Sequence, residues 1–289
     1  GVSFQLYELA RNFLYSSQEE LLSNPGFFLN MPKVQLEVPE QTSFGIIPYI
    51  SSQRNFVTNQ SEHNFGLNLL YKPAHHQRLS LAINPDFGQV DSDEIVLNYS
   101  TVETLRTDKR PFFTQDIGFF HVQLEEDTRL IHTRRIGAGA DDGSSGITPI
   151  DLAARFIHQG ETWQLGAFAV QEDKLASDAG KHFSAARLKI NQASWQSGLL
   201  LTHTEHPHIE RNSQLLAWDS QFRQANWSIQ GALLTSRDNN DSEGHGANLS
   251  GRYEFSSLTN LTASYLRLDN QFNSNDLGYQ RRNNWRIGK

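Results

Sequence analysis

Three tryptophans recur at a fixed interval in the second half of this 289-residue chain. Trp163, Trp195 and Trp227 stand 32 residues apart, and each directly follows a short polar turn. On both sides of each turn lies a segment of roughly ten residues, which is the length that a tilted membrane strand requires. A fourth short turn at 256–259 keeps the interval. The repeat therefore predicts a run of antiparallel hairpins.

Longer polar loops separate these hairpins. They cover 172–180, 205–211, 237–244 and 269–276. Short turns that alternate with long polar loops are the layout of an outer-membrane β-barrel, whose short turns face the periplasm. Because aromatic residues form girdles at membrane interfaces, we predict that Trp163, Trp195 and Trp227 are interface aromatics.

Apolar and polar residues alternate along several segments, as expected for strands with two different faces. The clearest segments are 64–72, 150–156 and 247–255. One expected apolar face consists of Ile150, Leu152, Ala154 and Phe156. The pattern is less regular in 181–190, where Arg187 and Lys189 fall on the face of Phe183. An apolar face toward lipid fits a membrane barrel, but a soluble antiparallel sandwich also alternates and stays an alternative.

Composition excludes several classes of protein. The chain has 25 Lys and Arg against 32 Asp and Glu, a net charge of −7, which does not suit a broadly basic nucleic-acid binder. It has no Cys, so disulfides, thiolate catalysis and Cys-ligated metal sites are excluded. No run approaches the roughly 20 apolar residues of a transmembrane helix. The chain begins at Gly1 without a leader, so we expect any signal peptide to have been removed or to lie upstream.

The first half of the chain is less regular. We expect a short helix at 17–22 and strands at 44–51, 64–72 and 78–84. From 85 to 146 the sequence is charge-dense and has no clean period. Because that stretch is too long for a connecting loop, we expect it in the lumen of a barrel or as an extended surface loop. No domain boundary is evident, so we predict one barrel domain over 1–289, incomplete by itself.

The irregular stretch holds the densest chemistry, with carboxylates first and cations after them. We predict a lumenal charge network of Asp86, Asp91, Asp93, Glu103, Lys109, Arg110, Arg134 and Arg135, because buried charges must be paired. Two alternatives stay open. One is a Ca²⁺ site made by Asp86, Asp91, Asp93 and Glu94, since a hard cation prefers clustered oxygens. The other is a pair of these acids that hydrolyses a glycosidic bond, although no catalytic residue is assigned.

The histidines suggest a metal site only weakly. His203, His206 and His208 fall within six residues together with Glu205, which is a possible Zn or Cu ligand set. A solvated polar loop explains them better, so we predict no metal and no cofactor. The sequence has no phosphate-binding glycine loop, dinucleotide fingerprint or zinc-protease helix.

Several strings of residues resemble a known family. They are IPYIS (47–51), NPDFGQVDSD (84–93), Asn98, Glu103, KRPFF (109–113), RRIG (134–137) and LGYQRRN (277–283). Together they resemble an uncharacterised bacterial barrel family, whose members usually carry this domain after a family-9-type carbohydrate-binding module. The chain departs from the family pattern at 107–108 and 131–133, which affects local packing. It resembles roughly the first half of that barrel domain.

These observations lead to one main prediction. The chain is expected to be an all-β, antiparallel outer-membrane-type barrel, or part of one, with 85–146 as a lumenal or plug-like segment. The resemblance implies a Gram-negative cell outer membrane and a structural, transport or secretion role linked to envelope or surface polysaccharide. Expected partners are outer-membrane lipid, a polysaccharide, and further strands from a missing C-terminal half or a partner chain, but no nucleic acid. The alternatives are a surface glycan-active enzyme of the glycoside hydrolase type and a soluble carbohydrate-binding β-domain.

Overall fold

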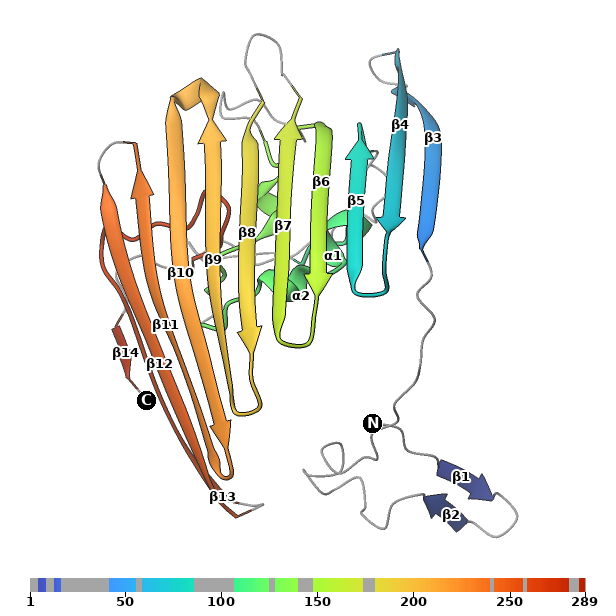
Figure 1. Cartoon of the computed structure of the whole chain (residues 1–289). Helices are drawn as coiled ribbons and strands as arrows, with labels where there is room; N and C mark the ends of the chain where they lie inside the picture. The colour runs from blue at the N-terminus through green and yellow to red at the C-terminus, as the bar shows by residue number, and fades with distance from the viewer. Residues whose placement is uncertain are drawn as a thin grey trace.

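The computed structural model describes residues 5–8, 13–16, 42–55, 59–85, 107–124, 128–139, 148–173, 180–239, 242–256, 259–280 and 286–288 (Figure 1). Within these ranges one antiparallel sheet contains twelve strands in the order β14-β13-β12-β11-β10-β9-β8-β7-β6-β5-β4-β3. Each strand therefore pairs with its neighbours in the chain. The strands β1 (Gln5–Glu8) and β2 (Phe13–Ser16) form a separate antiparallel pair. The helix predicted at 17–22 lies outside the described residues.

The strands confirm the predicted hairpins. Those of the large sheet are β3 (Ser43–Asn55), β4 (Gln60–Lys72), β5 (Gln77–Ile83), β6 (Ile150–Gln159), β7 (Trp163–Glu172), β8 (His182–Asn191), β9 (Trp195–His206), β10 (Arg211–Gln224), β11 (Trp227–Asp238), β12 (Glu243–Ser256), β13 (Thr259–Leu268) and β14 (Arg286–Gly288). Short turns precede β7, β9, β11 and β13, and longer connections lie at the opposite end of the sheet (Figure 1). One of these connections contains the short helix η2 (Pro207–Ile209).

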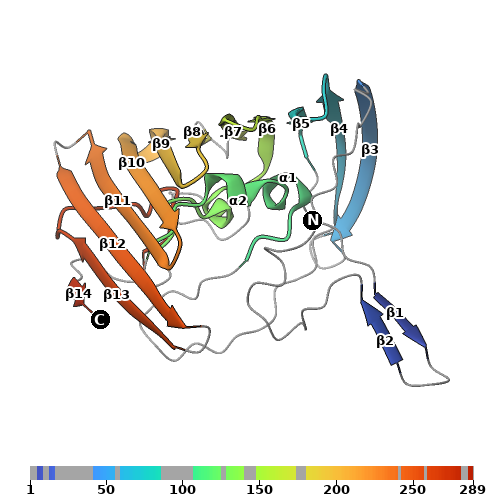
Figure 2. The ribbon, with the colours of Figure 1, turned by 60° about the horizontal axis from the view of Figure 1, so that its bottom comes forward.

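The register of the sheet assigns each side chain to one of two faces. Trp218 of β10 lies opposite Leu199 of β9 and Leu233 of β11, and all three side chains are exposed. The next residue, Ala217, lies opposite Leu200 and is fully buried. Because successive side chains of a strand point to opposite faces, the exposed row defines the outer, convex face and the buried row the inner, concave face. Figure 2 shows the sheet curved around the segment that covers its inner face.

One expected face is wrong in the structure. Ile150 was predicted to lie on the same face as Leu152, but Ile150 is 2% exposed and Leu152 is 40% exposed. The pairing of β6 with β7 shifts register between these two residues. A β-bulge inserts one extra residue and so reverses the face of everything before it. Ile150 therefore joins the buried core, together with Ala153 and Ile157.

Two short helices and one 3₁₀ turn lie inside the curve of the sheet (Figures 1 and 2). They are α1 (Pro111–Thr114), α2 (Ile117–Phe120) and η1 (Thr133–Arg135). We call residues 107–124 and 128–139 the inner segment. Its buried side chains, Phe113, Phe119, Phe120, Val122, Leu130 and Ile136, form one core with the inner face of β5 to β13. The hydrophobic core of the molecule is therefore the space that the sheet encloses.

The sheet has two edges among the described residues. β3 pairs on one side with β4, and β14 pairs on one side with β13. No described pairing joins β3 to β14, so the sheet forms an open, curved wall. The predicted fold class, an antiparallel all-β structure of barrel type, is confirmed as a wall that is not closed. In the part of the chain that the structure describes, no helix is both long and apolar enough to cross a membrane.

Candidate functional site: a two-faced wall and its inner segment

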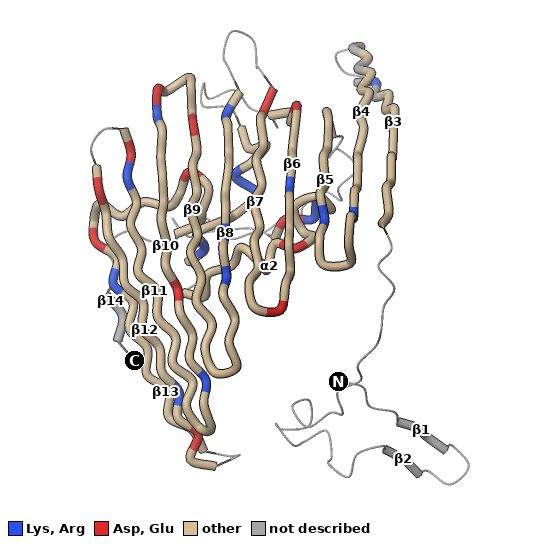
Figure 3. The backbone as a smooth tube through the Cα atoms, in the orientation of Figure 1, with Lys and Arg blue, Asp and Glu red and all other residues tan. Residues whose placement is uncertain are grey.

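The outer face carries an apolar band. Its exposed large side chains in β7 to β13 are Trp163, Leu188, Ile190, Trp195, Leu199, Leu201, Leu216, Trp218, Phe222, Trp227, Ile229, Leu233, Leu249, Phe255, Leu261 and Tyr265. Charged residues share this face only where the strands meet the long loops. These are Glu205, Arg237, Glu243 and Arg267, as the register places them. Figure 3 shows the charges of β11 to β13 near the strand ends, with uncharged lengths between them.

The three repeated tryptophans begin β7, β9 and β11 at the short-turn end of this band. Trp163, Trp195 and Trp227 are 47%, 42% and 52% exposed, so their rings are not part of the core. The Trp163 ring stacks on His158 at 4.0 Å between centroids, and Trp227 lies 4.6 Å from Tyr253. The band is thus bounded by aromatic rings at one end and by charges at the other.

On the inner face, Arg155 of β6 binds the end of α1. Its guanidinium donates to the carbonyl oxygens of Phe112 and Gln115 and to the Gln115 side chain. It also lies 3.8 Å from Asp116, which forms a 2.7 Å ion pair with Arg78 of β5. Since the last carbonyls of a helix have no partner within the helix, a buried cation is a suitable group to satisfy them. Arg155 therefore fixes α1 to the wall.

Arg187 of β8 binds the end of α2 in the same way. Its side chain is 2% exposed and donates to the carbonyl oxygen of Phe120 at 3.1 Å. Two further bonds of 2.9 Å run to both carboxylate oxygens of Asp219 on β10. The strand between them carries Gly198, where a Cβ would lie 2.9 Å from Asp219 and 3.1 Å from Arg187. The missing side chain leaves room for this bidentate pair across β9.

A third anchor joins the two basic strings that carry the family resemblance. Arg110 donates to the carbonyl oxygens of Ile136 at 2.8 Å and Thr133 at 2.7 Å. The amide of Gly137, which follows Ile136, donates to the carboxylate of Glu172 at 2.7 Å. Gly137 has a φ of +77°, a conformation that side-chain-bearing residues rarely adopt. The strings 109–113 and 134–137 therefore lie side by side at the end of β7.

Arg110 also pairs with a carboxylate two residues earlier in the sequence, that of Asp108. The Asp108 side chain accepts three guanidinium bonds of 2.9, 3.2 and 2.7 Å from Arg110 and one of 2.7 Å from the Thr133 hydroxyl. Burial by itself raises the pKa of the Asp108 carboxyl, but the bonds and charge of Arg110 outweigh that effect. The pKa of Asp108 therefore lies below its ordinary value, and Asp108 is a carboxylate at neutral pH.

The residues after β13 return to the inner segment. Arg129 and Tyr279 exchange two backbone hydrogen bonds of 2.8 and 2.7 Å, and the His132 amide donates to Leu277 at 2.7 Å. Arg135 donates from Nε to the carbonyl oxygen of Gly278 at 3.1 Å. The described part of the resembling string 277–283 thus packs against the string 134–137.

The structure describes only the cations of the predicted charge network. Asp86, Asp91, Asp93, Glu94 and Glu103 lie outside the described residues, so their pairing stays a prediction, and so does a Ca²⁺ site. Lys109 is exposed. Arg110 and Arg135 have the contacts given above, and Arg134 belongs to η1.

The candidate histidines do not converge. His203 lies on the outer face, where its Nε2 is 2.9 Å from Glu205. His206 lies on the inner face, 3.8 Å from Asp276, which also pairs with Arg211 at 2.9 Å. His208 belongs to η2. Within the described ranges, no three His, Asp or Glu side chains form a group that could hold a metal ion.

Sequence reasoning missed the anchors on the strands. Arg155, Arg187, Glu172 and Asp219 were not predicted as site residues, and neither was Asp108. A signal was present in the sequence. Arg155 and Arg187 are charged residues within strands, and each occupies a position that alternates with the exposed apolar residues of its strand. In a strand whose other face is apolar and exposed, a charged residue at such a position faces the interior.

Comparisons with known proteins give a partial family match. Residues 41–157, from β3 to β6 and including the inner segment, match the model described as Domain of unknown function (DUF5916). No curated protein matches the chain. Among solved structures, the chain is similar to an L8 loop-deletion mutant of OmpT, an outer membrane protein of Vibrio cholerae. That likeness has a TM-score of 0.34 and 8% identity over 80% of this chain and 94% of that one.

In-vitro folded OmpT of Vibrio cholerae in its trimer form gives a TM-score of 0.34 and 10% identity over 80% of this chain and 89% of that one. The family match agrees with the resemblance to an uncharacterised family. It does not bear on the carbohydrate-binding module that the resemblance implies. It covers less than half of the chain, and it includes the strings 84–93, 109–113 and 134–137. Residues 41–157 are thus similar to a domain whose function is not known.

Proposed function

We propose that this chain forms the wall of a cell outer-membrane barrel whose lumen is occupied by the inner segment. The observation that carries the proposal is the outer face of β7 to β13. Between the aromatic row and the charges at the long loops, this face presents only apolar and small or uncharged polar side chains. In a bilayer such a band faces hydrocarbon, and aromatic residues lie at its borders.

Water would be a poor solvent for this face. Monomeric soluble proteins rarely expose contiguous apolar patches larger than a few hundred Å². Here Leu199, Trp218 and Leu233 lie opposite one another on three adjacent strands, and each is 45–56% exposed. The strands β6 to β13 contain 10 to 14 residues each, which is enough to cross a bilayer at a tilt.

The free edges of β3 and β14 need partners in lipid, because an unpaired backbone group costs several kcal/mol there. Further strands from elsewhere in the protein or from a partner chain would supply them. Thirteen residues of β3 are available for such pairing.

The inner segment would act as a plug or gate. Arg155, Arg187 and Glu172 hold it to the wall at three separate strands, and its aromatic residues fill the space beside β7. A role in transport or secretion across the outer membrane would require this segment to move. The link to envelope or surface polysaccharide rests on the family resemblance, in which the domain follows a carbohydrate-binding module.

The experiment is extraction of the native protein followed by electrophoresis in SDS with and without heating. We expect release from the envelope only by detergent and a shift in mobility on heating. The folded protein would then be inserted in planar bilayers, with low conductance expected while the inner segment is in place. Release into buffer without detergent would contradict the proposal and would favour a soluble glycan-binding or glycan-active β-domain.

A further inference from the structure

We infer that the inner segment contains a binding site for a small organic anion, meaning a carboxylate or phosphate attached to a short apolar portion. This goes beyond the proposed function and does not depend on the membrane. The site is a pocket of about 240 Å³ between the end of α2 and the stretch 129–131. Its lining residues are Ile117, Gly118, Phe120, His121, Val122, Arg129, Leu130 and Ile131.

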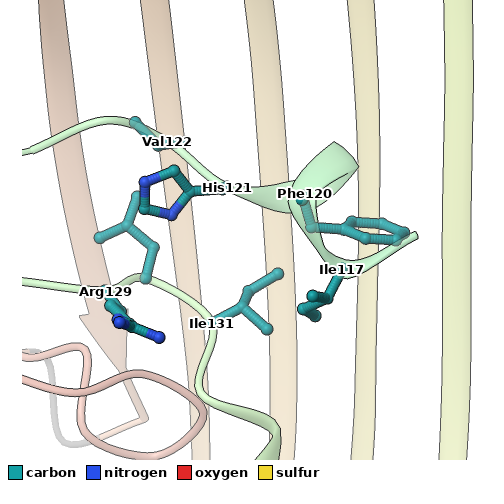
Figure 4. A pocket seen from close by; sticks show the side chains of 8 residues that line it. Ile117, Phe120, His121, Val122, Arg129 and Ile131 are labelled. Atoms are coloured by element: carbon teal, nitrogen blue, oxygen red, sulfur yellow. The ribbon is translucent and has the colours of Figure 1, made fainter. Parts of the chain in front are cut away.

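The pocket is divided into a polar and an apolar side. Figure 4 shows His121 and Arg129 on one side together with Val122, and Ile131, Ile117 and Phe120 toward the other. A ligand in it would place a charged head against the first pair and carbon atoms against the second group. The volume lies below the roughly 300–1,000 Å³ of pockets for drug-sized molecules, so the ligand must be small.

The polar side has positive charge that the described residues do not neutralise. Asp219 is engaged by both bonds from Arg187. Lys189 of β8 lies beside α2, with Nζ 5.1 Å from the Phe119 ring. In the described part of the chain neither Lys189 nor Arg129 forms an ion pair.

The pKa of His121 is sensitive to these cations. Burial and then the charges of Arg129, Arg187 and Lys189 lower the pKa of His121, and only Asp219 acts in the opposite direction. Among the described residues, three cations act on the ring from one direction and a single carboxylate from the other. An anion bound there would restore the balance and accept hydrogen bonds from His121 and the Arg129 guanidinium, which are strong when one partner is charged.

The scaffold tolerates changes at this site. The hydrogen bonds that hold residue 129 in place are those of its backbone with Tyr279, so Arg129→Gln keeps them. A Cβ at Gly118 would have no atom within 4 Å, so Gly118→Leu adds a side chain at the pocket lining without a clash at its Cβ. Arg223 offers a matched control, because it is an exposed cation on the inner face near the short turns.

The test is titration of the full chain, folded in a nonionic detergent, with hexanoate, followed by ¹H–¹⁵N NMR. Inorganic phosphate and hexanol serve as probes that carry only one of the two required properties. We expect saturable shifts for hexanoate that centre on 117–122 and 129–131, and much weaker binding of either control probe. Arg129→Gln should weaken hexanoate binding by about tenfold or more, Gly118→Leu should weaken it by altering the lining, and Arg223→Gln should leave it unchanged.

Three results would overturn the inference. Equal affinity for hexanol would remove the role of charge, and equal affinity for phosphate would remove that of the apolar side. Unchanged hexanoate binding by Arg129→Gln would show that this guanidinium does not hold the anion. Each of these outcomes leaves the proposed membrane role untouched, because none concerns the outer face.

Discussion

The two faces of the sheet differ in what their side chains contact, although the residues of both faces alternate along the same strands. On β10, Leu216 and Trp218 are exposed on the outer face, whereas Leu215 and Ala217 are buried and Asp219 is paired on the inner face. The outer face has exposed apolar side chains, and no described element covers it. The inner face has charges, and those described in β6 to β8 bind the inner segment. Hydrophobicity alone therefore does not show where the core is.

The difference indicates what each face contacts. A charge is stable on the inner face because a specific group meets it, such as the Phe120 carbonyl for Arg187. A contiguous band of leucine and tryptophan on the outer face is better accommodated by a nonpolar environment than by water. The predictions below test this division, beginning with the largest expected effect.

Removing an inner charge should cost the most. Arg187→Leu leaves the Phe120 carbonyl and the Asp219 carboxylate without their partner. Breaking a fully buried pair costs about 3–5 kcal/mol, which is an upper value here because the Asp219 side chain is 24% exposed. Urea unfolding of the protein in detergent would measure the loss. Arg223→Leu, at an exposed position of the same face, should change the free energy of unfolding little. The double change Arg187→Leu with Asp219→Leu should recover part of the loss. Equal losses of stability in Arg187→Leu and Arg223→Leu would contradict the account.

Adding a charge to the outer face should cost nearly as much in a bilayer. Leu199→Arg lies within the apolar band, and a cation near the midplane of a bilayer costs about 2–4 kcal/mol. Gln214→Arg on the same face, in the row of His203 beside the long loops, should cost about 0–1 kcal/mol. The measurement is the free energy of folding into lipid vesicles. If both variants fold equally well there, the outer face is not in contact with lipid.

Filling a contact between wall and inner segment should have a moderate effect. A Cβ at Gly166 of β7 would overlap the Phe119 ring, so Gly166→Ala must displace that ring at a cost of about 1–3 kcal/mol. Gly251→Ala of β12 is the control, because no atom lies within 4 Å of its Cβ position. Thermal unfolding and protease cleavage within 107–139 would report the difference. Loss of stability without increased cleavage would contradict docking of α2 at this point.

The smallest effect concerns acid. Since the folded pKa of Asp108 is lowered, its contribution to stability is complete above the unfolded carboxyl pKa of about 3.9 and is lost as pH falls through the folded pKa. We expect the unfolding midpoint to fall with acid below about pH 4. Asp108→Asn should reduce this dependence. A variant whose acid profile matches that of the native protein would show that Asp108 is not coupled to folding.

The sequence predicted the strands of the wall better than the contacts between the wall and the inner segment. The 32-residue spacing of Trp163, Trp195 and Trp227 located three hairpins, because a turn residue and a two-residue period are local properties. The face of Ile150 was wrong, because a bulge one residue long reverses a face without changing composition. Register errors of this kind cannot be detected from alternation alone.

The anchors of the inner segment depend on long-range contacts. Arg155 binds residues about 40 positions away, and Arg187 reaches back 67 positions to Phe120. The irregular pattern around Arg187 and Lys189 looked like a weak strand, yet it marked the place where the wall meets α2. The cations of 109–113 and 134–137 were predicted to belong to one charge network, whose predicted acids lie outside the described residues. Asp108, which pairs with Arg110 from two residues away, was not predicted.

The most direct test of the two-faced wall is a scan of single cysteines along β10, which is clean because the chain has no native Cys. Spin labels at 214–222 in lipid vesicles would be compared for contact with oxygen, which concentrates in lipid, and with a water-soluble nickel chelate. The account predicts a two-residue period in which labels at Leu216, Trp218 and Ser220 contact oxygen and those at Leu215 and Ala217 contact neither reagent strongly. Labels at Leu216 and Trp218 that contact the nickel chelate as freely as one at Gln214 would contradict it.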